Sequence, residues 1–261
     1  MENDFKKKYS INKPKISIIT AVYNGAVTIE DSIMSVLNQT YENIEYIIID
    51  GGSADESVDI IKKYEPQFYG KLKWVSEKDY GIYDAWNKGI SISTGEWISF
   101  LGSDDIFYPN AIELFVSKIE SNHMLNFISS KILLVETDLK PIGSKGEKWS
   151  VNMKSYCEIA HVGSLHHKSL FDIKGLFDIS YKITGDYEFL LRAYDLIIPD
   201  YLPVDTVMVR TGGISQSNIF DVARETLRAK QENKALSVLH CHFDFWVSIL
   251  KFKMRLFKLG S

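Results

Sequence analysis

The chain has 261 residues, of which 45% are hydrophobic and 25% are charged, and its formal net charge is −4. This size and hydrophobic content are sufficient for the core of one large α/β domain, with or without an appendage. The chain carries no net positive charge, which argues against a nucleic-acid-binding protein.

The cysteines and the N-terminal residues indicate the compartment. Cys157 and Cys241 form neither a C-x-x-C pair nor a zinc pattern, so we expect two free thiols in a reducing environment. Residues 1–15 are charged and lack the apolar segment of a secretory signal, and no uninterrupted apolar run reaches about 18 residues. These features predict a cytosolic protein that is soluble or peripheral to a membrane.

Apolar segments of strand length alternate with helical segments in the first part of the chain. The segments Lys15–Val22, Ile44–Asp50 and Leu72–Glu77 are predicted strands. Each is followed by a turn and a helical pattern, the third of them over Ile82–Ile90. This alternation predicts a parallel sheet, in which ligands bind at the carboxyl ends of the strands.

Two of these helices carry recognisable starting signals. Thr28 with Asp31 is typical of an N-cap followed by an acid at the third helical position, and Ser53 with Glu56 is typical of a capping box. Neither G-x-G-x-x-G nor G-x-x-x-x-G-K-[S/T] occurs, which removes the usual dinucleotide and P-loop sites. A nucleotide would therefore be held in another way.

The apolar segment Glu96–Asp105 ends in two adjacent carboxylates, Asp104 and Asp105. Two acids at the end of a buried strand are costly unless a cation neutralises them, so the pair is a candidate metal site. The alternative is an N-terminal cap for the helix predicted over Pro109–Glu120, where proline and acids are both favoured. The two roles are compatible.

Four segments occur in a fixed order: ITAVYNG, IIIDGGSADES, SEKDYGIYDAWNKGI and STGEWISFLGSDD. Together they resemble the family 2 glycosyltransferases, which are inverting enzymes of the GT-A fold. The resemblance is strong over Lys15–Tyr108 and extends more weakly to Ser215. It implies an α/β domain with a Rossmann-like mixed sheet flanked by helices. The implied organisation is a tail over 1–14, a catalytic domain over 15–217 with a nucleotide-sugar half (15–108) and an acceptor half (109–217), and a C-terminal helical extension over 218–261.

The resemblance also implies a donor site. Asp50 would hydrogen-bond the uracil ring, although an acid directly after a strand is more often a turn former. Asp104–Asp105 match the family's acidic metal motif, with Ser103 in place of its first acid. Mn²⁺ or Mg²⁺ is expected, because hard cations take oxygen ligands. The implied nucleotide-binding residues are Thr20, Tyr23, Asn24, Asp50, Gly52, Asp84, Asn87, Lys88 and Asp104, and the implied metal ligands are Asp104 and Asp105.

The second half of the chain supplies a candidate general base. Phe127–Thr137 is a predicted strand, and Lys140–Ser150, which contains proline and glycine, is a predicted loop that could cover the site. Asp186 opens a predicted helix, and the resemblance makes it the base of an inverting transfer. Glu188 is the rival, on a different side of that helix. For either acid, helix-start electrostatics is the alternative role.

Four further residues are candidate contacts to the acceptor or the diphosphate: His161, Arg210, Gly212 and Gly213. Arg210 and the glycines lie in VMVRTGGISQS, a predicted strand and turn that could approach an anion or be an ordinary tight turn. His161 is placed near the site, with a structural histidine as the alternative. Its spacing to His166 and His167 matches no zinc pattern.

From Phe220 onward the chain is predicted to be helical to its end. Apolar residues recur there at intervals of three and four, and the last turns contain lysines and arginine without acids. A basic, aromatic-rich amphipathic helix is typical of a membrane-surface element, and packing on the domain or on a second subunit is the alternative. The apolar residues are Leu236, Leu239, Phe243, Trp246, Leu250, Met254 and Phe257.

Together with these features, the resemblance implies a metal-dependent inverting glycosyltransferase at the cytoplasmic face of the inner membrane. It would move a hexose or N-acetylhexosamine from UDP-Glc, UDP-Gal or UDP-GalNAc to an undecaprenyl diphosphate-linked N-acetylhexosamine. The product would be a β-1,3 linkage in O-antigen or surface-polysaccharide repeat-unit assembly. A non-catalytic nucleotide-sugar-binding scaffold is disfavoured because the acids are intact. A sugar nucleotidyltransferase is disfavoured because no glycine-rich triphosphate loop occurs near the N-terminus.

Overall fold

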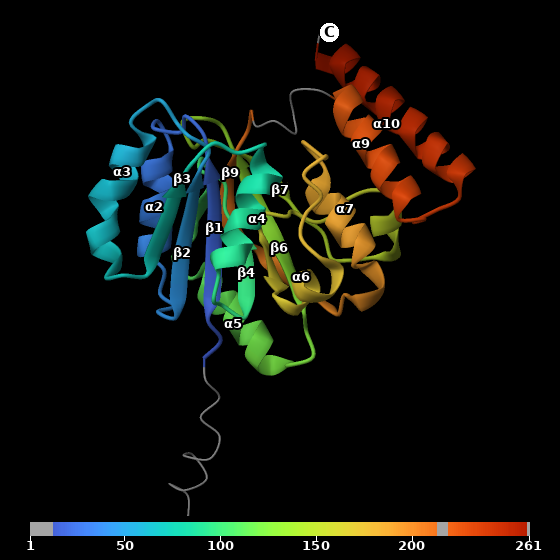
Figure 1. Cartoon of the computed structure of the whole chain (residues 1–261). Helices are drawn as coiled ribbons and strands as arrows, with labels where there is room; N and C mark the ends of the chain where they lie inside the picture. The colour runs from blue at the N-terminus through green and yellow to red at the C-terminus, as the bar shows by residue number, and fades with distance from the viewer. Residues whose placement is uncertain (1–12, 213–218, 260–261) are drawn as a thin grey trace, which may run out of the picture.

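The computed structural model describes residues 13–212 and 219–259 (Figure 1). Within these residues, nine strands form one sheet in the order β3-β2-β1-β4-β8-β6-β9-β5, with β7 also paired to β6. The strands are β1 (Ile16–Val22), β2 (Ile44–Asp50), β3 (Leu72–Ser76), β4 (Trp97–Phe100), β5 (Ile106–Phe107), β6 (Phe127–Val135), β7 (Pro141–Lys145), β8 (Ser164–His167) and β9 (Pro199–Arg210).

The sheet is mixed, and most of its strands end at the same edge. β1 pairs in parallel with β2 and β4, and β2 pairs in parallel with β3. β8 runs antiparallel to both β4 and β6, whereas β9 is parallel to β6. The carboxyl ends of β1, β2, β3, β4 and β9 therefore share the upper edge of the sheet in Figure 1. This is the edge at which the sequence predicts ligand binding.

Helices cover both faces of the sheet. The core on one face includes residues of α2, α3 and α5, and the core on the other includes residues of α4, α6 and α7. The helices are α2 (Ile29–Leu37), α3 (Ser57–Tyr64), α4 (Ile82–Ile92), α5 (Ala111–Ser121), α6 (Ser169–Lys174), α7 (Gly185–Arg192), α9 (Ile219–Glu232) and α10 (Val238–Leu259).

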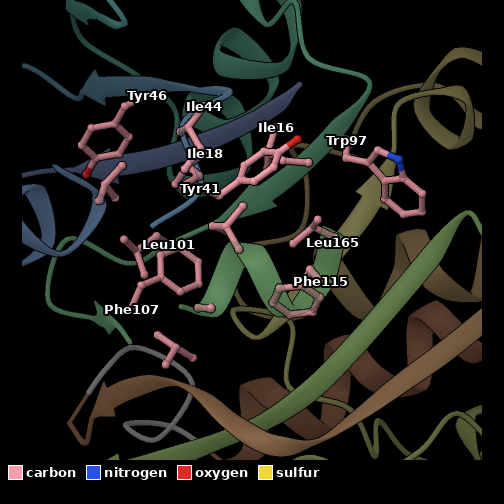
Figure 2. Packing of buried hydrophobic residues seen from close by; sticks show 14 of the residues in the cluster. Ile16, Ile18, Tyr41, Ile44, Tyr46, Trp97, Leu101, Phe107, Phe115 and Leu165 are labelled. Carbon is pink, nitrogen blue, oxygen red and sulfur yellow. The ribbon is translucent and has the colours of Figure 1, made fainter. Parts of the chain in front are cut away.

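The side chains of β1 alternate between these two cores. Ile16 and Ile18 belong to the first core, shown in Figure 2, and Ile19 belongs to the second. Strands buried on both faces need near-continuous apolar sequence, which is what β1 and β2 contain. The first three predicted strands are thereby confirmed.

The predicted capping box is wrong. α3 begins at Ser57, and neither α2 nor α3 has a side-chain cap hydrogen bond. The hydroxyl of Ser53 instead donates to Asp50 and accepts from the backbone N–H of Asn24. Contacts between the loops after β1 and β2 thus replace the local cap.

The segment predicted as a loop over Lys140–Ser150 contains a strand. Pro141–Lys145 forms β7, which pairs antiparallel with the end of β6, and all five of its residues are exposed. Because no residue of β7 enters the core, the strand has no apolar pattern that the sequence could reveal. It is held by backbone pairing with β6 and by a hydrogen bond from the Ser144 hydroxyl to Asp205 Oδ2 at 2.9 Å.

The C-terminal region is a hairpin of two helices rather than one. α9 ends at Glu232, Lys234 adopts a positive φ of 49°, and α10 begins at Val238. α9 packs against both α7 and α10, so α10 lies at the outer side of the molecule (Figure 1). In the part of the chain that the structure describes, no helix has the length and hydrophobicity needed to cross a membrane.

Candidate active site

The loops that follow β1 and β2 are joined by side-chain hydrogen bonds. Asn24 has a left-handed backbone φ of 51°, which asparagine tolerates better than most residues. Its backbone N–H donates to Ser53 Oγ at 2.8 Å, and its Oδ1 accepts from the N–H of Ala54 at 2.9 Å. Asp55 Oδ2 accepts from the N–H of Ala26 at 2.9 Å. The two loops therefore form one surface at the edge of the sheet.

Asp50 is fully buried and hydrogen-bonded within its own turn. Its Oδ2 accepts from the N–H groups of Gly52 and Ser53, each at 3.1 Å, and from Ser76 Oγ at 2.7 Å. Its Oδ1 accepts from Ser53 Oγ at 2.5 Å. Gly52 has a φ of 83°, which glycine adopts without strain. These contacts are those of a turn-forming aspartate, the alternative to the expected uracil contact.

The other implied nucleoside residues differ in exposure. Thr20 is buried, and its hydroxyl accepts a hydrogen bond from Tyr46 at 3.0 Å. Tyr23 is 67% exposed, and Asn24 is exposed beside it. A nucleoside at this edge would therefore meet Tyr23 and Asn24, with Thr20 beneath them.

Asp79 is an acid at this edge for which sequence reasoning gave no role. Its Oδ1 accepts from the N–H of Gly81 at 2.9 Å. Its Oδ2 lies over Gly51, where an added Cβ would be 2.6 Å from this oxygen. A side chain at position 51 would therefore displace the Asp79 carboxylate from this position. The position of Asp79 just after the third predicted strand was the available signal.

α4 contributes three of the implied nucleotide-binding residues. Lys88 Nζ lies 2.8 Å from Glu77 Oε1 and 3.6 Å from Asp84 Oδ2. Asn87 donates to the carbonyl of Phe177 at 2.9 Å and accepts from its N–H at 3.0 Å. Asn87 thus fixes α4 to the turn that leads to α7. Asp84 and Lys88 form a charged cluster with Glu77.

The acidic pair, Asp104 and Asp105, follows β4, and one of its carboxylate oxygens has no hydrogen-bond partner among the described residues. Asp105 is 4% exposed, and within the described residues its Oδ1 has no hydrogen-bond partner. Its Oδ2 accepts from the N–H of Gly102 at 3.2 Å. Burial and the neighbouring carboxylate of Asp104 raise the pKa of Asp105. A cation would relieve both the repulsion and the missing contact, so the pair fits a divalent metal.

Arg210, the last residue of β9, holds the acidic loop in place. Its guanidinium donates to the backbone carbonyl of Asp104 and to the carboxylate of Asp31 in α2, both at 2.5 Å. Across residues 13–212 and 219–259, no three acidic, histidine or cysteine side chains are grouped closely enough to hold a metal. A metal at the pair would complete its coordination with substrate phosphates, as magnesium commonly does.

Asp186 lies at the start of α7 and is tied to α4. The hydroxyl of Tyr83 is 3.2 Å from Asp186 Oδ1 and 2.8 Å from the carbonyl of Ile183. Burial raises the pKa of Asp186, whereas hydrogen bonds from the Tyr187 N–H and from Tyr83 lower it. The carboxylate lines a cavity between α7 and the C-terminal hairpin. A half-buried carboxylate with a raised pKa suits a general base.

Glu188, the rival base, is engaged in an ion pair. Both of its oxygens contact the guanidinium of Arg192, at 3.0 Å each, and Asn233 donates to Oε1 at 3.2 Å. The side chain is buried and is not part of the cavity lining that contains Asp186. These contacts give Glu188 a structural role.

Glu225 in α9 is a positioning residue that sequence reasoning missed. Its carboxylate accepts from the backbone N–H groups of Lys182, Ile183 and Thr184, at 2.8, 2.8 and 2.9 Å. These amides precede α7 and are separated from Asp186 by Gly185, so α9 holds in place the segment that leads into this helix. Glu225 is 41 residues from Thr184 in the sequence, so no local sequence pattern predicts the contact.

His161 lies outside the solvent-accessible site. Its ring is 7% exposed, stacks on Phe100 and packs against Trp86, with both centroid distances 5.1 Å. Among the described residues, neither of its ring nitrogens has a hydrogen-bond partner. This packing favours the structural alternative, and the expected acceptor contact stays a prediction. Gly212 is exposed with a φ of 110°, and Gly213 lies outside the described residues.

Known glycosyltransferases are similar to this chain in sequence. Residues 17–137 match the model of the family described as glycosyl transferase family 2. The chain carries a family 2 glycosyltransferase domain. A PGL/p-HBAD biosynthesis glycosyltransferase of Mycobacterium bovis is 26% identical over 182 residues, covering 69% of this chain and 70% of that protein. An uncharacterized glycosyltransferase of Rickettsia prowazekii is 29% identical over 260 residues, covering 94% and 74%.

Solved structures share the fold of this chain. S. aureus TarS 1-349 in complex with UDP-GlcNAc matches with a TM-score of 0.70 and 18% identity, over 88% of this chain and 70% of that one. Another TarS chain matches with a TM-score of 0.68, and 41% of its length is covered. A Pyrobaculum calidifontis mannosyltransferase in complex with GDP-Man and Mn²⁺ matches with a TM-score of 0.67 and 14% identity. The GT-A fold expected from the sequence is confirmed.

Proposed function

We propose that this glycosyltransferase moves a hexose or N-acetylhexosamine from a UDP-sugar to a hydroxyl of a lipid diphosphate-linked N-acetylhexosamine, with inversion. The observation that supports this proposal most directly is the half-buried side chain of Asp186, whose pKa is raised by burial and which lines a cavity. A UDP donor is supported by the similarity to TarS, whose structure contains UDP-GlcNAc. The lipid-linked acceptor, the β-1,3 linkage and a role in O-antigen assembly rest on the sequence resemblance.

In this proposal Asp186 accepts the proton of the acceptor hydroxyl. The hydroxyl oxygen forms a bond to the anomeric carbon while the bond from that carbon to the UDP oxygen breaks, and UDP leaves with the electron pair. Asp104 and Asp105 would hold Mn²⁺ or Mg²⁺, which supplies charge neutralisation for the diphosphate when bound. Arg210 keeps the acidic loop in position through the carbonyl of Asp104.

Replacement of Asp186 tests the proposed base. We expect Asp186→Asn to lower kcat by a factor of about 10² to 10⁴, the usual contribution of a general base. The affinity for UDP should stay unchanged, because Asp186 lies outside the loops after β1, β2 and β4. Transfer from a panel of UDP-sugars with Mn²⁺, together with calorimetric titration of UDP, measures both quantities.

Glu188→Gln is the matched control for this experiment. It removes a carboxylate from the same helix and should lower thermal stability through the loss of the Arg192 pair. Transfer by the folded fraction should persist. Wild-type kcat in Asp186→Asn would overturn the base assignment.

We also propose that α10 contacts the surface of an anionic membrane. Its outer face carries a continuous row of exposed apolar side chains, the apolar stripe: Leu239 (85% exposed), Phe243 (66%), Trp246 (65%), Leu250 (60%) and Met254 (55%). Monomeric proteins rarely leave such rows in water, and they mark protein or membrane contacts. In sequence, lysines and arginine at 251, 253, 255 and 258 adjoin it, which favours anionic lipid. The vesicle experiment under Discussion tests this contact.

A further inference from the structure

A cavity of about 330 Å³ lies between α7, α9, α10 and the segment around Cys157. Asp186 is part of its wall, together with Thr184, which precedes α7, and Tyr187 of α7. This volume is at the lower end of the range for small-molecule sites, which bind ligands through apolar walls and a few polar groups. The sequence placed the acceptor site in residues 109–217, whereas half of this wall comes from the C-terminal hairpin.

The lining of this cavity combines aromatic and aliphatic side chains with hydroxyl groups. The aromatic and aliphatic members include Tyr156, Tyr187, Val222, Leu227 and Phe245. The hydroxyl-bearing members include Ser155, Thr226 and Ser248. A sugar ring presents an apolar C–H face and a rim of hydroxyl groups, so a wall of this mixed character matches it. An N-acetyl methyl group would add further apolar contact.

The charges in the wall disfavour a diphosphate. Lys230 is the one lysine or arginine among the described lining residues, and it is 2% exposed. Its Nζ lies 2.9 Å from Asp244 Oδ2, so its charge is already paired within the wall. Asp186 adds a negative charge. An anionic group would thus meet a carboxylate and no available cation, whereas a neutral ring with a hydroxyl group would meet an acceptor for its proton.

From this combination we infer that the cavity is the subsite for the terminal sugar ring of the acceptor, an N-acetylhexosamine whose attacked hydroxyl faces Asp186. The inference rests on the proposed function and specifies which residues bind the acceptor. The lipid diphosphate lies outside the cavity. The hairpin binds the ring directly and positions the base through the contacts of Glu225 with residues 182–184.

Two pocket-filling variants test this subsite. Thr226→Trp adds a large ring from α9, and Ser248→Trp adds one from the exposed rim of α10, where folding is less at risk. Gln231→Trp is the control, because Gln231 is exposed on α9 and is not in the lining. The binding probe is N-acetylglucosamine in the presence of UDP, followed by saturation-transfer NMR, and transfer to N-acetylglucosamine is measured in parallel.

We expect both pocket-filling variants to lose the saturation transfer to the N-acetyl methyl group and to raise the KM for N-acetylglucosamine by more than about tenfold. UDP affinity should stay as in the wild type, and Gln231→Trp should behave as the wild type in every measurement. Asp186→Asn should bind N-acetylglucosamine without transferring to it. Unaltered sugar binding in folded Thr226→Trp and Ser248→Trp, or no binding to the wild type, overturns the subsite. Full transfer by Asp186→Asn overturns the proposed base while leaving the binding result interpretable.

Discussion

Tyr83 connects the donor side of the site to the base through one hydroxyl group. Tyr83→Phe removes the hydrogen bond that lowers the pKa of Asp186, so that pKa should rise further. Because the base works deprotonated, the acidic limb of the kcat/KM profile should move to higher pH. We also expect kcat to fall by about tenfold, the effect of losing one hydrogen bond to a charged group. Initial rates over a pH series measure both effects.

Tyr181→Phe is the control for this prediction. The hydroxyl of Tyr181 donates to Glu232 at 2.7 Å and has no contact with Asp186. Its removal should leave the pH profile in place. An unshifted profile in Tyr83→Phe would mean that the phenol does not influence the base.

His161 makes the stability of the fold dependent on pH. Burial lowers its pKa from 6.5 to about 3. In the unfolded chain His161 therefore binds a proton below about pH 6.5, whereas in the folded chain it stays neutral until about pH 3. The free energy of unfolding consequently decreases as the pH falls through this window. His161→Phe should abolish this part of the loss, about 1.4 kcal/mol for each pH unit below 6.5. Urea unfolding of both proteins between pH 7 and pH 4 measures the difference.

The control for His161 is an exposed histidine. His123→Gln alters a side chain at the end of α5 that is exposed to solvent. Its stability should follow that of the wild type at every pH. If His161→Phe lost stability with pH as steeply as the wild type, the buried ring would not be the source.

At the scale of elements, α9 determines the geometry of the base. Glu225→Ala leaves the amides of residues 182–184 without their carboxylate acceptor. We expect these amides to exchange with deuterium faster and kcat to fall, because Asp186 lies only two residues after the last of them. Hydrogen-exchange mass spectrometry and transfer rates measure the two effects. Arg224→Ala, whose side chain is 77% exposed, is the control and should change neither.

The elements that sequence reasoning predicted are those that carry their own pattern. β1 and β2 have continuous apolar runs because both of their faces are buried, and the sequence placed them correctly. β7 was missed because all its residues are exposed, and the capping box at Ser53 was wrong because a neighbouring loop took its hydroxyl. A residue pattern within one segment of the sequence cannot predict the contacts that a distant segment makes with it.

The candidate site residues also divide into those with a sequence pattern of their own and those that depend on another segment. Asp104, Asp105 and Asp186 could be proposed from the sequence because each stands at the end of a strand or the start of a helix in a recognisable motif. Glu225 was missed because its partners are more than 40 residues away. α10 was predicted as amphipathic, but its polar residue Asp244 faces α9 and its apolar stripe faces outward. The spacing of residues in a sequence shows which side chains share a face of a helix. It does not show which face is turned toward the rest of the protein.

At the scale of the whole molecule, the apolar stripe predicts binding to lipid. Phe243→Ser with Trp246→Ser should lower the binding to phosphatidylglycerol–phosphatidylethanolamine vesicles by more than about tenfold, because two aromatic side chains lose their burial. Binding of the wild type should weaken with added salt and on phosphatidylcholine alone. Vesicle co-sedimentation measures these effects.

Tyr69→Ser is the control for the vesicle experiment. Tyr69 is 91% exposed and lies in the segment that follows α3 in the chain, and α3 and α10 lie at opposite sides of the molecule (Figure 1). Its loss removes an exposed aromatic side chain without touching the stripe. Equal binding by the double variant and the wild type would exclude the stripe as the lipid contact.

The single sheet has a consequence for how the two substrates meet. β4 pairs with β8, and β5 pairs with β9, so backbone hydrogen bonds join residues before position 108 to residues well after it. A hinge between the two halves would have to break these ladders. If the proposed function holds, donor and acceptor would therefore meet without domain closure between these two halves, in a site whose two sides are already joined by one sheet.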